Sequence, residues 1–195
     1  MVLVSRAELI EKAIAGQVVS FPTDTVPALA TLPQQAELLY QVKQRPTTKP
    51  LILMGATWQD LVTYIQGTTK ELNVWQTIAQ AYFPGAVTLV LPASELVPQE
   101  MNPTKSGTIG IRVPASSVAR EILQHTGALA TTSANLSGEA TLVTTKAIAE
   151  VFTQVNVLQS SKPTESQGSG LPSTVVQWQS GSWQVLRQGS VYFKF

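Results

Sequence analysis

The sequence predicts an α/β domain built on a mixed sheet. Short runs of β-branched residues alternate along the chain with longer runs in which apolar residues recur every three or four positions. Of the 195 residues, 44% are hydrophobic, which is ample for a packed core. No repeat and no shift in composition marks a boundary, so we expect a single domain over residues 1–195.

Each element is predicted from a local pattern. Ser5-x-x-Glu8, Thr57-x-x-Asp60 and Thr68-x-x-Glu71 have the spacing of residues that open helices. Runs of β-branched residues bounded by turn residues indicate strands. The patterns predict helices from Ser5 to near Gly16, over 34–44, from a start at 57, from a start at 68 towards 83, over 117–125 and over 144–152. They predict strands over 18–21, 51–54, 86–91, 108–113, 128–132, 155–158, 174–176 and 183–186. In chain order, the helices and strands alternate over most of the sequence.

Residues 159–172 are rich in Ser, Gly and Pro and are expected to form a loop. A loop of this length inside a compact domain is commonly functional or disordered. We hypothesise that it is a lid that orders over the substrates and excludes water.

The composition excludes several chemistries. A net charge of +1 argues against a protein that coats nucleic acid through a large basic face. The chain has no cysteine and a single histidine, His125, which we expect near a helix C-terminus, and we find no cluster of metal ligands. Neither a Gly-x-Ser-x-Gly elbow nor a glycine-rich nucleotide fingerprint is present, so a nucleotide would have to be bound by side-chain cations and loop amides. Without a secretory signal or an apolar spanning segment, the expected location is cytoplasmic.

The most unusual segment is Lys43-Gln44-Arg45-Pro46-Thr47-Thr48-Lys49, which places three cations within seven residues just before the apolar run 51–54. Two interpretations compete. One is a solvated turn at a helix end, where cations suit the helix dipole. The other is a cradle for a polyanion such as a nucleoside triphosphate. The motif by itself favours the turn.

Polar segments follow several of the predicted strands, at the edge where open α/β sheets bind their ligands. Small hydroxyls, an amide and a glycine in such turns can surround an anionic ligand with donors, although the same residues are common in ordinary turns. Arg112 lies within a strand-like run, where a charge is usually paired or bound to a ligand. The polar segments are 22–25, 43–49, 131–138 and 172–174.

Taken together, these motifs resemble those of the YrdC/TsaC family. The Lys-x-Arg-Pro motif at Lys43 and the Ser-Ala-Asn-x-Ser-Gly motif at Ser133 are the most specific matches. The others lie in family order and cover nearly the whole chain: Phe21-Pro22-Thr23-Asp24-Thr25-Val26, Phe83-Pro84-Gly85-Ala86-Val87-Thr88, Thr108 to Pro114, Ser173-Thr174-Val175-Val176 and Leu186-Arg187-Gln188-Gly189.

The resemblance implies an open, twisted, mixed parallel and antiparallel sheet flanked by helices, with a concave ligand pocket, in a single YrdC-like domain. It implies a nucleotidyltransferase that condenses L-threonine, bicarbonate and ATP into threonylcarbamoyl-adenylate and pyrophosphate. The adenylate would supply the threonylcarbamoyl group for an adenosine beside the anticodon of tRNA, through the tRNA threonylcarbamoyl-transfer machinery. Mg²⁺ would be carried by the ATP phosphates, and no metal site on the protein is expected.

Residue roles follow from the resemblance by position. Lys43 and Arg45 are the implied catalytic residues, with Lys43 lining the phosphate or bicarbonate region. The implied ATP contacts are Arg45, Lys49, Thr108, Asn135, Thr144 (or its neighbour Val143) and Arg187. The implied threonine contacts are Thr25, Arg112, Ser133 and Ser173, with Arg112 suited to a bidentate grip on the carboxylate.

The chain also departs from the family pattern. Val26-Pro27-Ala28-Leu29-Ala30 replaces a Val-Tyr-Gly-Leu-Gly continuation, which changes a loop expected at the pocket wall, and Met54 stands where many relatives have histidine. Three alternatives remain open: a YrdC-like paralogue without synthase activity, an enzyme that forms an adenylate from carbamoyl phosphate, and a module that binds tRNA or double-stranded RNA without catalysis.

Overall fold

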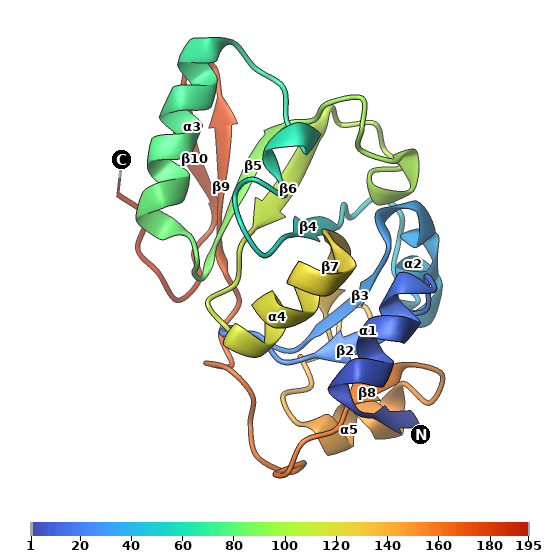
Figure 1. The fold of residues 1–195 in the computed structure, drawn as a ribbon. Helices are drawn as coiled ribbons and strands as arrows, with labels where there is room; N and C mark the ends of the chain where they lie inside the picture. The colour runs from blue at the N-terminus through green and yellow to red at the C-terminus, as the bar shows by residue number, and fades with distance from the viewer. Residues whose placement is uncertain (1, 195) are drawn as a thin grey trace.

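The computed structural model describes residues 2–194, and within them one ten-stranded mixed sheet runs through the molecule (Figure 1). Its strand order is β1-β8-β2-β3-β7-β4-β6-β5-β9-β10. The strands are β1 (Val2–Val4), β2 (Val19–Phe21), β3 (Ala28–Thr31), β4 (Ile52–Met54), β5 (Val87–Pro92), β6 (Thr108–Arg112), β7 (Leu129–Ser133), β8 (Asn156–Leu158), β9 (Thr174–Gln179) and β10 (Ser182–Arg187). The sheet contains parallel pairs such as β4–β6 and antiparallel pairs such as β3–β7, which confirms the predicted mixed sheet.

Helices flank both faces of this sheet. Figure 1 shows α1 and α4 crossing β2, β3 and β7, whereas α3 lies beside β9 and β10. The helices are α1 (Arg6–Ile14), α2 (Glu37–Lys43), α3 (Thr69–Tyr82), α4 (Ser117–Thr126) and α5 (Thr145–Val151), with short 3-10 turns at Pro33–Gln35, Val62–Tyr64 and Gln99–Met101. Over residues 2–194, no helix is long and apolar enough to cross a membrane.

The sheet separates two apolar cores because successive strand residues point to opposite faces. On one face, Ala28, Ala30 and Leu129 pack with residues of α1 and α4. On the other face, Leu29 and Ala130 belong to the larger core that includes residues of α2, α3 and α5. The pairing register therefore decides which strand residues can reach a ligand on the α1/α4 side.

The expected capping boxes at two helix starts are confirmed. In α1 the Ser5 hydroxyl accepts from the Glu8 amide, and the Glu8 carboxylate accepts from the Ser5 amide. Thr68 and Glu71 make the same reciprocal pair at the start of α3. Each box satisfies backbone donors that the first helical turn leaves without partners.

Three expectations about elements are wrong. Thr57 and Asp60 form the reciprocal bonds of a helix start, at 2.8 and 3.3 Å, but no α-helix follows. The chain instead makes a turn and a short 3-10 segment, because Ile65 is drawn into an extended bridge with Ala93. The helix expected over 34–44 is α-helical only from Glu37, after a 3-10 turn that begins at Pro33.

The segment after Val26 also differs from expectation, because a loop was predicted there at the pocket wall. Val26 and Pro27 do line a cavity, but β3 begins at Ala28 and all four of its residues are buried between β2 and β7. Strand pairing on both sides overrides the low strand propensity of alanine. The edge strand β1 was also not predicted. That residues 1–195 fold as a single unit stays a prediction.

Candidate functional site

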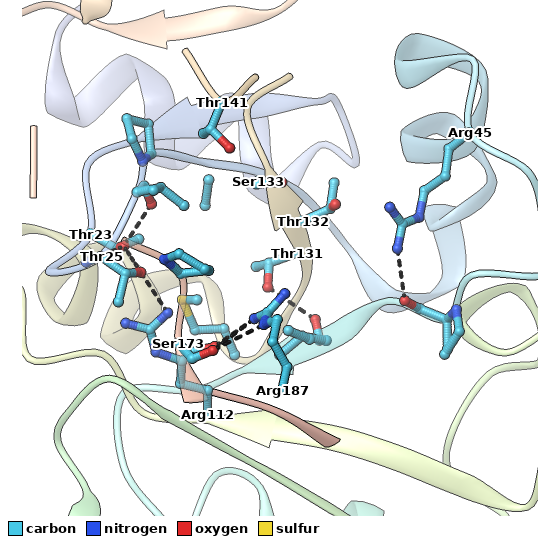
Figure 2. Close-up of a pocket in the computed structure, with 17 residues that line it drawn as sticks. Thr23, Thr25, Arg45, Arg112, Thr131, Thr132, Ser133, Thr141, Ser173 and Arg187 are labelled. Carbon is cyan, nitrogen blue, oxygen red and sulfur yellow. Dashed lines mark hydrogen bonds between the residues drawn. The ribbon is translucent and has the colours of Figure 1, made fainter. Parts of the chain in front are cut away.

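A cavity of about 310 Å³ opens on the α1/α4 face of the sheet (Figure 2). Register places Ser133 opposite Ala28, Thr131 opposite Ile52, and Arg112 opposite Met54, so these side chains share that face. Loops from several parts of the chain complete the wall. The lining residues are Thr23, Thr25, Val26, Pro27, Ala28, Arg45, Pro50, Ile52, Met54, Arg112, Thr131, Thr132, Ser133, Thr141, Pro172, Ser173 and Arg187.

Arg112 is a buried cation, with 4% of its surface exposed, and three hydrogen bonds fix its side chain. Its Nε donates to the Gly85 carbonyl at 3.0 Å, Nη1 donates to the Thr25 hydroxyl at 2.8 Å, and Nη2 pairs with Asp24 at 2.8 Å. Burial lowers the pKa of Arg112, and the Asp24 carboxylate opposes that shift. Three of the five N–H donors of a guanidinium are thus used, which leaves two for a ligand.

The Thr25 hydroxyl is oriented by its neighbours. The Thr23 hydroxyl donates its single proton to the Val26 carbonyl at 2.7 Å. The contact of 3.0 Å between the two threonine hydroxyls must then have Thr25 as its donor. Because Thr25 also accepts from Arg112, it can offer a ligand only one remaining acceptor lone pair.

A second arginine and hydroxyl pair stands beside the first (Figure 2). Arg187 donates through Nε and Nη2 to the Ser173 carbonyl, at 3.2 and 2.9 Å, and its Nη2 lies 3.3 Å from the Ser173 hydroxyl. The fully buried Thr88 contacts the same hydroxyl at 2.9 Å. Ser173 is therefore fixed from two sides.

Arg45 faces the cavity from the opposite side of the opening in Figure 2. Its Nε donates to the Lys49 carbonyl and its Nη2 to the Pro50 carbonyl, both at 3.2 Å. These two bonds fold the loop after α2 around the guanidinium. Burial lowers the pKa of Arg45, and the neighbouring Tyr40 opposes the shift.

Lys43 does not line the cavity, unlike Arg45 two residues later. It is 1% exposed, and its ammonium donates to the Asn135 carbonyl at 2.6 Å, to the Asn135 side-chain oxygen at 3.1 Å, and to the Ser133 carbonyl. All three N–H donors are consequently used inside the protein. These hydrogen bonds from Lys43 fix the turn that follows β7.

The same turn fixes the Ser133 hydroxyl, which donates to the Asn135 side-chain oxygen at 2.6 Å. The Asn135 amide donates in turn to the Leu136 and Glu139 carbonyls, at 2.7 and 3.0 Å. Ser133 thus presents only acceptor lone pairs to the cavity, as Thr25 does. Asn135 is occupied within the turn and does not line the cavity.

The structure brings some of the predicted site residues together and leaves others apart. Six of them share the cavity: Thr25, Arg45, Arg112, Ser133, Ser173 and Arg187. Lys49 lies on the Arg45 loop, Thr108 begins β6, and Thr144 caps α5, where its hydroxyl accepts from the Ala147 amide. The lining does not include these three residues, Lys43 or Asn135, so their contacts with a ligand stay predictions.

Sequence reasoning assigned no role to Thr23, Asp24 or Thr88. Each lies within a motif that was recognised, but hydroxyls and a carboxylate in turns have many ordinary uses. Their importance follows from contacts between segments that are far apart in the chain, such as Thr88 with Ser173. The sequence signals that pointed to them were their places inside family motifs and, for Thr23 and Asp24, the polar segment 22–25 at a strand end.

The loop over 159–172 is fastened at several points. The Gln167 amide donates to the Val143 carbonyl at 2.8 Å, the Ser169 amide to the Asp24 carbonyl at 3.1 Å, and the Gly170 amide to the Thr25 carbonyl at 2.9 Å. The end of the loop therefore rests on the Thr23–Thr25 turn. Whether it moves when substrates bind stays a prediction.

We expect Gly168→Ala to destabilise the protein more than Gly170→Ala. Both glycines have a positive φ, +71° and +75°, so both substitutions carry a similar backbone cost of about 1 kcal/mol. A Cβ at Gly168 would also lie 2.4 Å from the Thr25 carbonyl oxygen, whereas nothing lies within 4 Å at Gly170. Urea unfolding should show an additional loss of about 1–3 kcal/mol for Gly168→Ala, and equal losses would contradict this packing.

We expect Lys43 to make stability depend on pH. Burial, and secondly the Arg45 charge, lower the pKa of Lys43 from 10.5 to about 7. Between these values the unfolded chain binds more protons than the folded one, so the free energy of unfolding due to Lys43 rises with pH. The free energy of unfolding of the wild type minus that of Lys43→Met should therefore rise from pH 7 to 9, by at most about 1.4 kcal/mol per pH unit. A difference that falls with pH would contradict this.

Comparisons with known proteins match most of the chain to one family. Residues 11–189 match the model of the Sua5/YciO/YrdC family, which carries the description "Telomere recombination". The chain is similar to the threonylcarbamoyl-AMP synthase of Rattus norvegicus, with 32% identity over 183 residues, which are 90% of this chain and 63% of the rat protein. It is also similar to the threonylcarbamoyl-AMP synthase of Vibrio campbellii, with 31% identity over 192 residues, which are 93% of this chain and 98% of the Vibrio protein.

The fold is similar to that of P. abyssi Sua5 in a crystal structure of its complex with L-threonine. The TM-score is 0.82 at 26% sequence identity, over 94% of this chain and 53% of that one. The chain thus spans 63% of the rat relative's length but nearly all of the Vibrio relative's. From the family match over most of its length, the chain belongs to the Sua5/YciO/YrdC family.

Proposed function

We propose that the protein is a threonylcarbamoyl-AMP synthase, which makes threonylcarbamoyl-adenylate and pyrophosphate from L-threonine, bicarbonate and ATP. The observation that carries this proposal is the convergence of Arg45, Arg112 and Arg187 on one cavity with oriented hydroxyls. The similarity to the Vibrio synthase along almost its full length supports the same reaction.

The charge of the cavity suits these substrates. Its described lining contains three guanidinium groups and no carboxylate. A triphosphate, an amino-acid carboxylate and bicarbonate are all anions, and guanidinium forks bind such groups with charge-assisted hydrogen bonds. The same positive field disfavours the ammonium form of a bound amine, and so favours the neutral form that acts as a nucleophile.

We assign the carboxylate of threonine to Arg112, through its two remaining donors. Thr25, Ser133 and Ser173 would surround the rest of the amino acid. Arg45 and Arg187 would contact ATP within the cavity, and Lys49, Thr108, Asn135 and Thr144 would contact it at the periphery. A cavity of about 310 Å³ is at the small end for such ligands, so the triphosphate would extend out of it past Arg45.

The proposed chemistry has two steps. The neutral amine of threonine attacks the carbon of bicarbonate, an N–C bond forms, and water leaves to give a carbamate. A carbamate oxygen then attacks the α-phosphorus of ATP in line, the bond to the bridging oxygen breaks, and pyrophosphate leaves. Arg45 would stabilise the charge that develops on the phosphates, while Lys43 would fix the Ser133–Asn135 turn beside the reacting groups.

The lining residues do not fit a protein-held magnesium site. Mg²⁺ prefers carboxylate oxygens, and the described lining has none. Among residues 2–194, no group of three or more His, Cys, Asp and Glu side chains could hold a metal ion. We therefore treat Mg²⁺ as part of the MgATP substrate, and no step depends on it.

The adenylate would pass to the tRNA threonylcarbamoyl-transfer machinery in the cytoplasm, which would modify the adenosine beside the anticodon. Direct binding of tRNA or double-stranded RNA is a weaker proposal, because the net charge is only +1. A YrdC-like paralogue without synthase activity is the second candidate, favoured only by the replacement of a family tyrosine and two glycines over Pro27–Ala30.

The deciding experiment is pyrophosphate release from ATP with and without L-threonine and bicarbonate, with mass spectrometry of the nucleotide product. Release that requires both co-substrates and yields the mass of threonylcarbamoyl-AMP would support the synthase. ATP binding without pyrophosphate release would favour the paralogue without synthase activity. Release with carbamoyl phosphate in place of threonine and bicarbonate would favour the carbamoyl-adenylate reaction.

A further inference from the structure

We propose that Thr23 is a positioning residue that makes the Thr25 hydroxyl an obligate acceptor for the amino group of the substrate. The proposal rests on the proposed function, because it presumes an amino-acid substrate in this cavity. Thr23 is 3% exposed, yet it lines the cavity beside Thr25.

The two threonine hydroxyls have only one proton each to donate. A hydroxyl has one proton and two acceptor lone pairs. The Thr23 proton is committed to the Val26 carbonyl at 2.7 Å, and its oxygen accepts from the Thr25 amide at 3.2 Å. Its remaining lone pair faces the Thr25 hydroxyl at 3.0 Å and can only receive that hydroxyl's proton.

The proton and one of the two lone pairs of the Thr25 hydroxyl are then already engaged within the protein. Its proton points to Thr23, and one of its lone pairs receives Nη1–H of Arg112 at 2.8 Å. The lone pair that remains cannot bind a carboxylate or phosphate oxygen, since two acceptors repel each other. It can bind an N–H or O–H of the ligand, and it lies beside the guanidinium that would hold the carboxylate.

Two other hydroxyls of the cavity, those of Ser133 and Thr131, follow the same rule, which supports this assignment. Ser133 donates its proton to the Asn135 side chain, and Thr131 donates its proton to the Ile52 carbonyl. The arginines of the cavity therefore offer donors to anionic groups, whereas the hydroxyls of Thr25, Ser133 and Thr131 offer acceptors. An α-amino acid, with a carboxylate and an amine on one carbon, fits this division.

Without Thr23, the Thr25 hydroxyl could rotate, and its free lone pair would no longer be held towards an N–H of the amine. The test compares the affinity of the full chain for L-threonine with its affinity for (R)-3-hydroxybutanoate, which keeps the carboxylate and the side-chain hydroxyl but lacks the amine. We expect Thr23→Val to weaken L-threonine binding by about tenfold and to leave the analogue within about twofold. Thr23→Ser should restore the preference.

The matched control is Thr31→Val. Thr31 is also buried, and its hydroxyl donates to the Gly16 carbonyl at 3.0 Å, but it does not line the cavity. This variant should lose comparable stability and keep the preference for L-threonine. A double-mutant cycle adds a second readout, because Thr23→Val should cost nothing further in a Thr25→Val background if it acts through Thr25.

Equal weakening of both ligands by Thr23→Val, or independent effects in the cycle, would overturn the proposal while the synthase function stands. If the wild-type protein binds neither ligand, both the proposal and the synthase function would be overturned, because no amino-acid amine would then lie in the cavity to donate to Thr25. Isothermal titration calorimetry measures each affinity, and thermal melts verify that each variant is folded.

Discussion

Arg112→Lys is expected to reduce kcat/KM for L-threonine by about 10³-fold. Lysine keeps the charge but cannot reproduce three bonds that leave the side chain in three directions, to Gly85, Thr25 and Asp24. It also loses the fork that would hold a carboxylate at two points. The loss should appear mainly as a higher KM for threonine, with the KM for ATP nearly unchanged.

Asp24→Asn separates geometry from charge in this prediction. The amide oxygen can still accept from Arg112 and from the Ala115 amide, which the Asp24 carboxylate now binds at 3.0 Å. We expect a loss of about tenfold, because a neutral acceptor holds the guanidinium less strongly. Steady-state kinetics with varied threonine measure both variants. An Arg112→Lys enzyme with wild-type KM for threonine would remove Arg112 from the carboxylate site.

Removing Arg112 altogether should damage the fold as well as the site. Arg112→Ala would remove the cation that pairs with Asp24, whose side chain is 18% exposed in the intact protein. Loss of one partner of such a pair costs about 3–5 kcal/mol in buried settings. The lysine variant is therefore the better test of function, and the alanine variant is a test of the structural role.

The sequence was sufficient to predict most of the fold, because the fold depends on local signals over much of the chain. The capping boxes at Ser5 and Thr68 act within one turn and were found correctly. β3 was not found, because alanine-rich Ala28–Thr31 is a strand only through its pairing with β2 and β7. Thr57 illustrates the converse, since the bonds of a helix start form there but no α-helix follows, because Ile65 is held in an extended bridge with Ala93.

In the candidate site too, some features could be predicted from local sequence and others depend on tertiary contacts. Residue types and their order along the chain pointed to Arg45, Arg112 and Arg187, which the fold brings to one cavity. The direction of each hydrogen bond could not be predicted, because it depends on pairs such as Thr88 with Ser173, 85 positions apart. Lys43 shows the limit most clearly. The same basic motif supplies one cation that faces the cavity and one that is wholly enclosed by the Ser133–Asn135 turn.

Arg45→Ala is expected to lower kcat by about 10²–10³-fold and to leave the free energy of unfolding within about 1 kcal/mol of wild type. The two bonds of Arg45 go to carbonyls of its own loop, at Lys49 and Pro50, so the core does not depend on them. Its loss would instead remove a fixed cation from the side of the cavity where the phosphates would lie. The effect should fall on kcat, because charge that builds up on the phosphates during attack is stabilised only in the transition state.

Three comparisons make this prediction specific. Arg45→Lys should recover part of the rate, since it restores charge without the fork. Arg6→Ala removes an arginine that pairs with Glu121 on the surface at 2.6 Å, and it should leave turnover unchanged. Lys43→Met should differ from Arg45→Ala by changing the pH dependence of unfolding, because Lys43 is enclosed and Arg45 is not. Single-turnover pyrophosphate release at saturating substrates measures the chemical step directly. Near-normal release by Arg45→Ala would mean that the cavity acts on the phosphates through Arg187 or the peripheral residues, and the assignment of Arg45 would have to be abandoned.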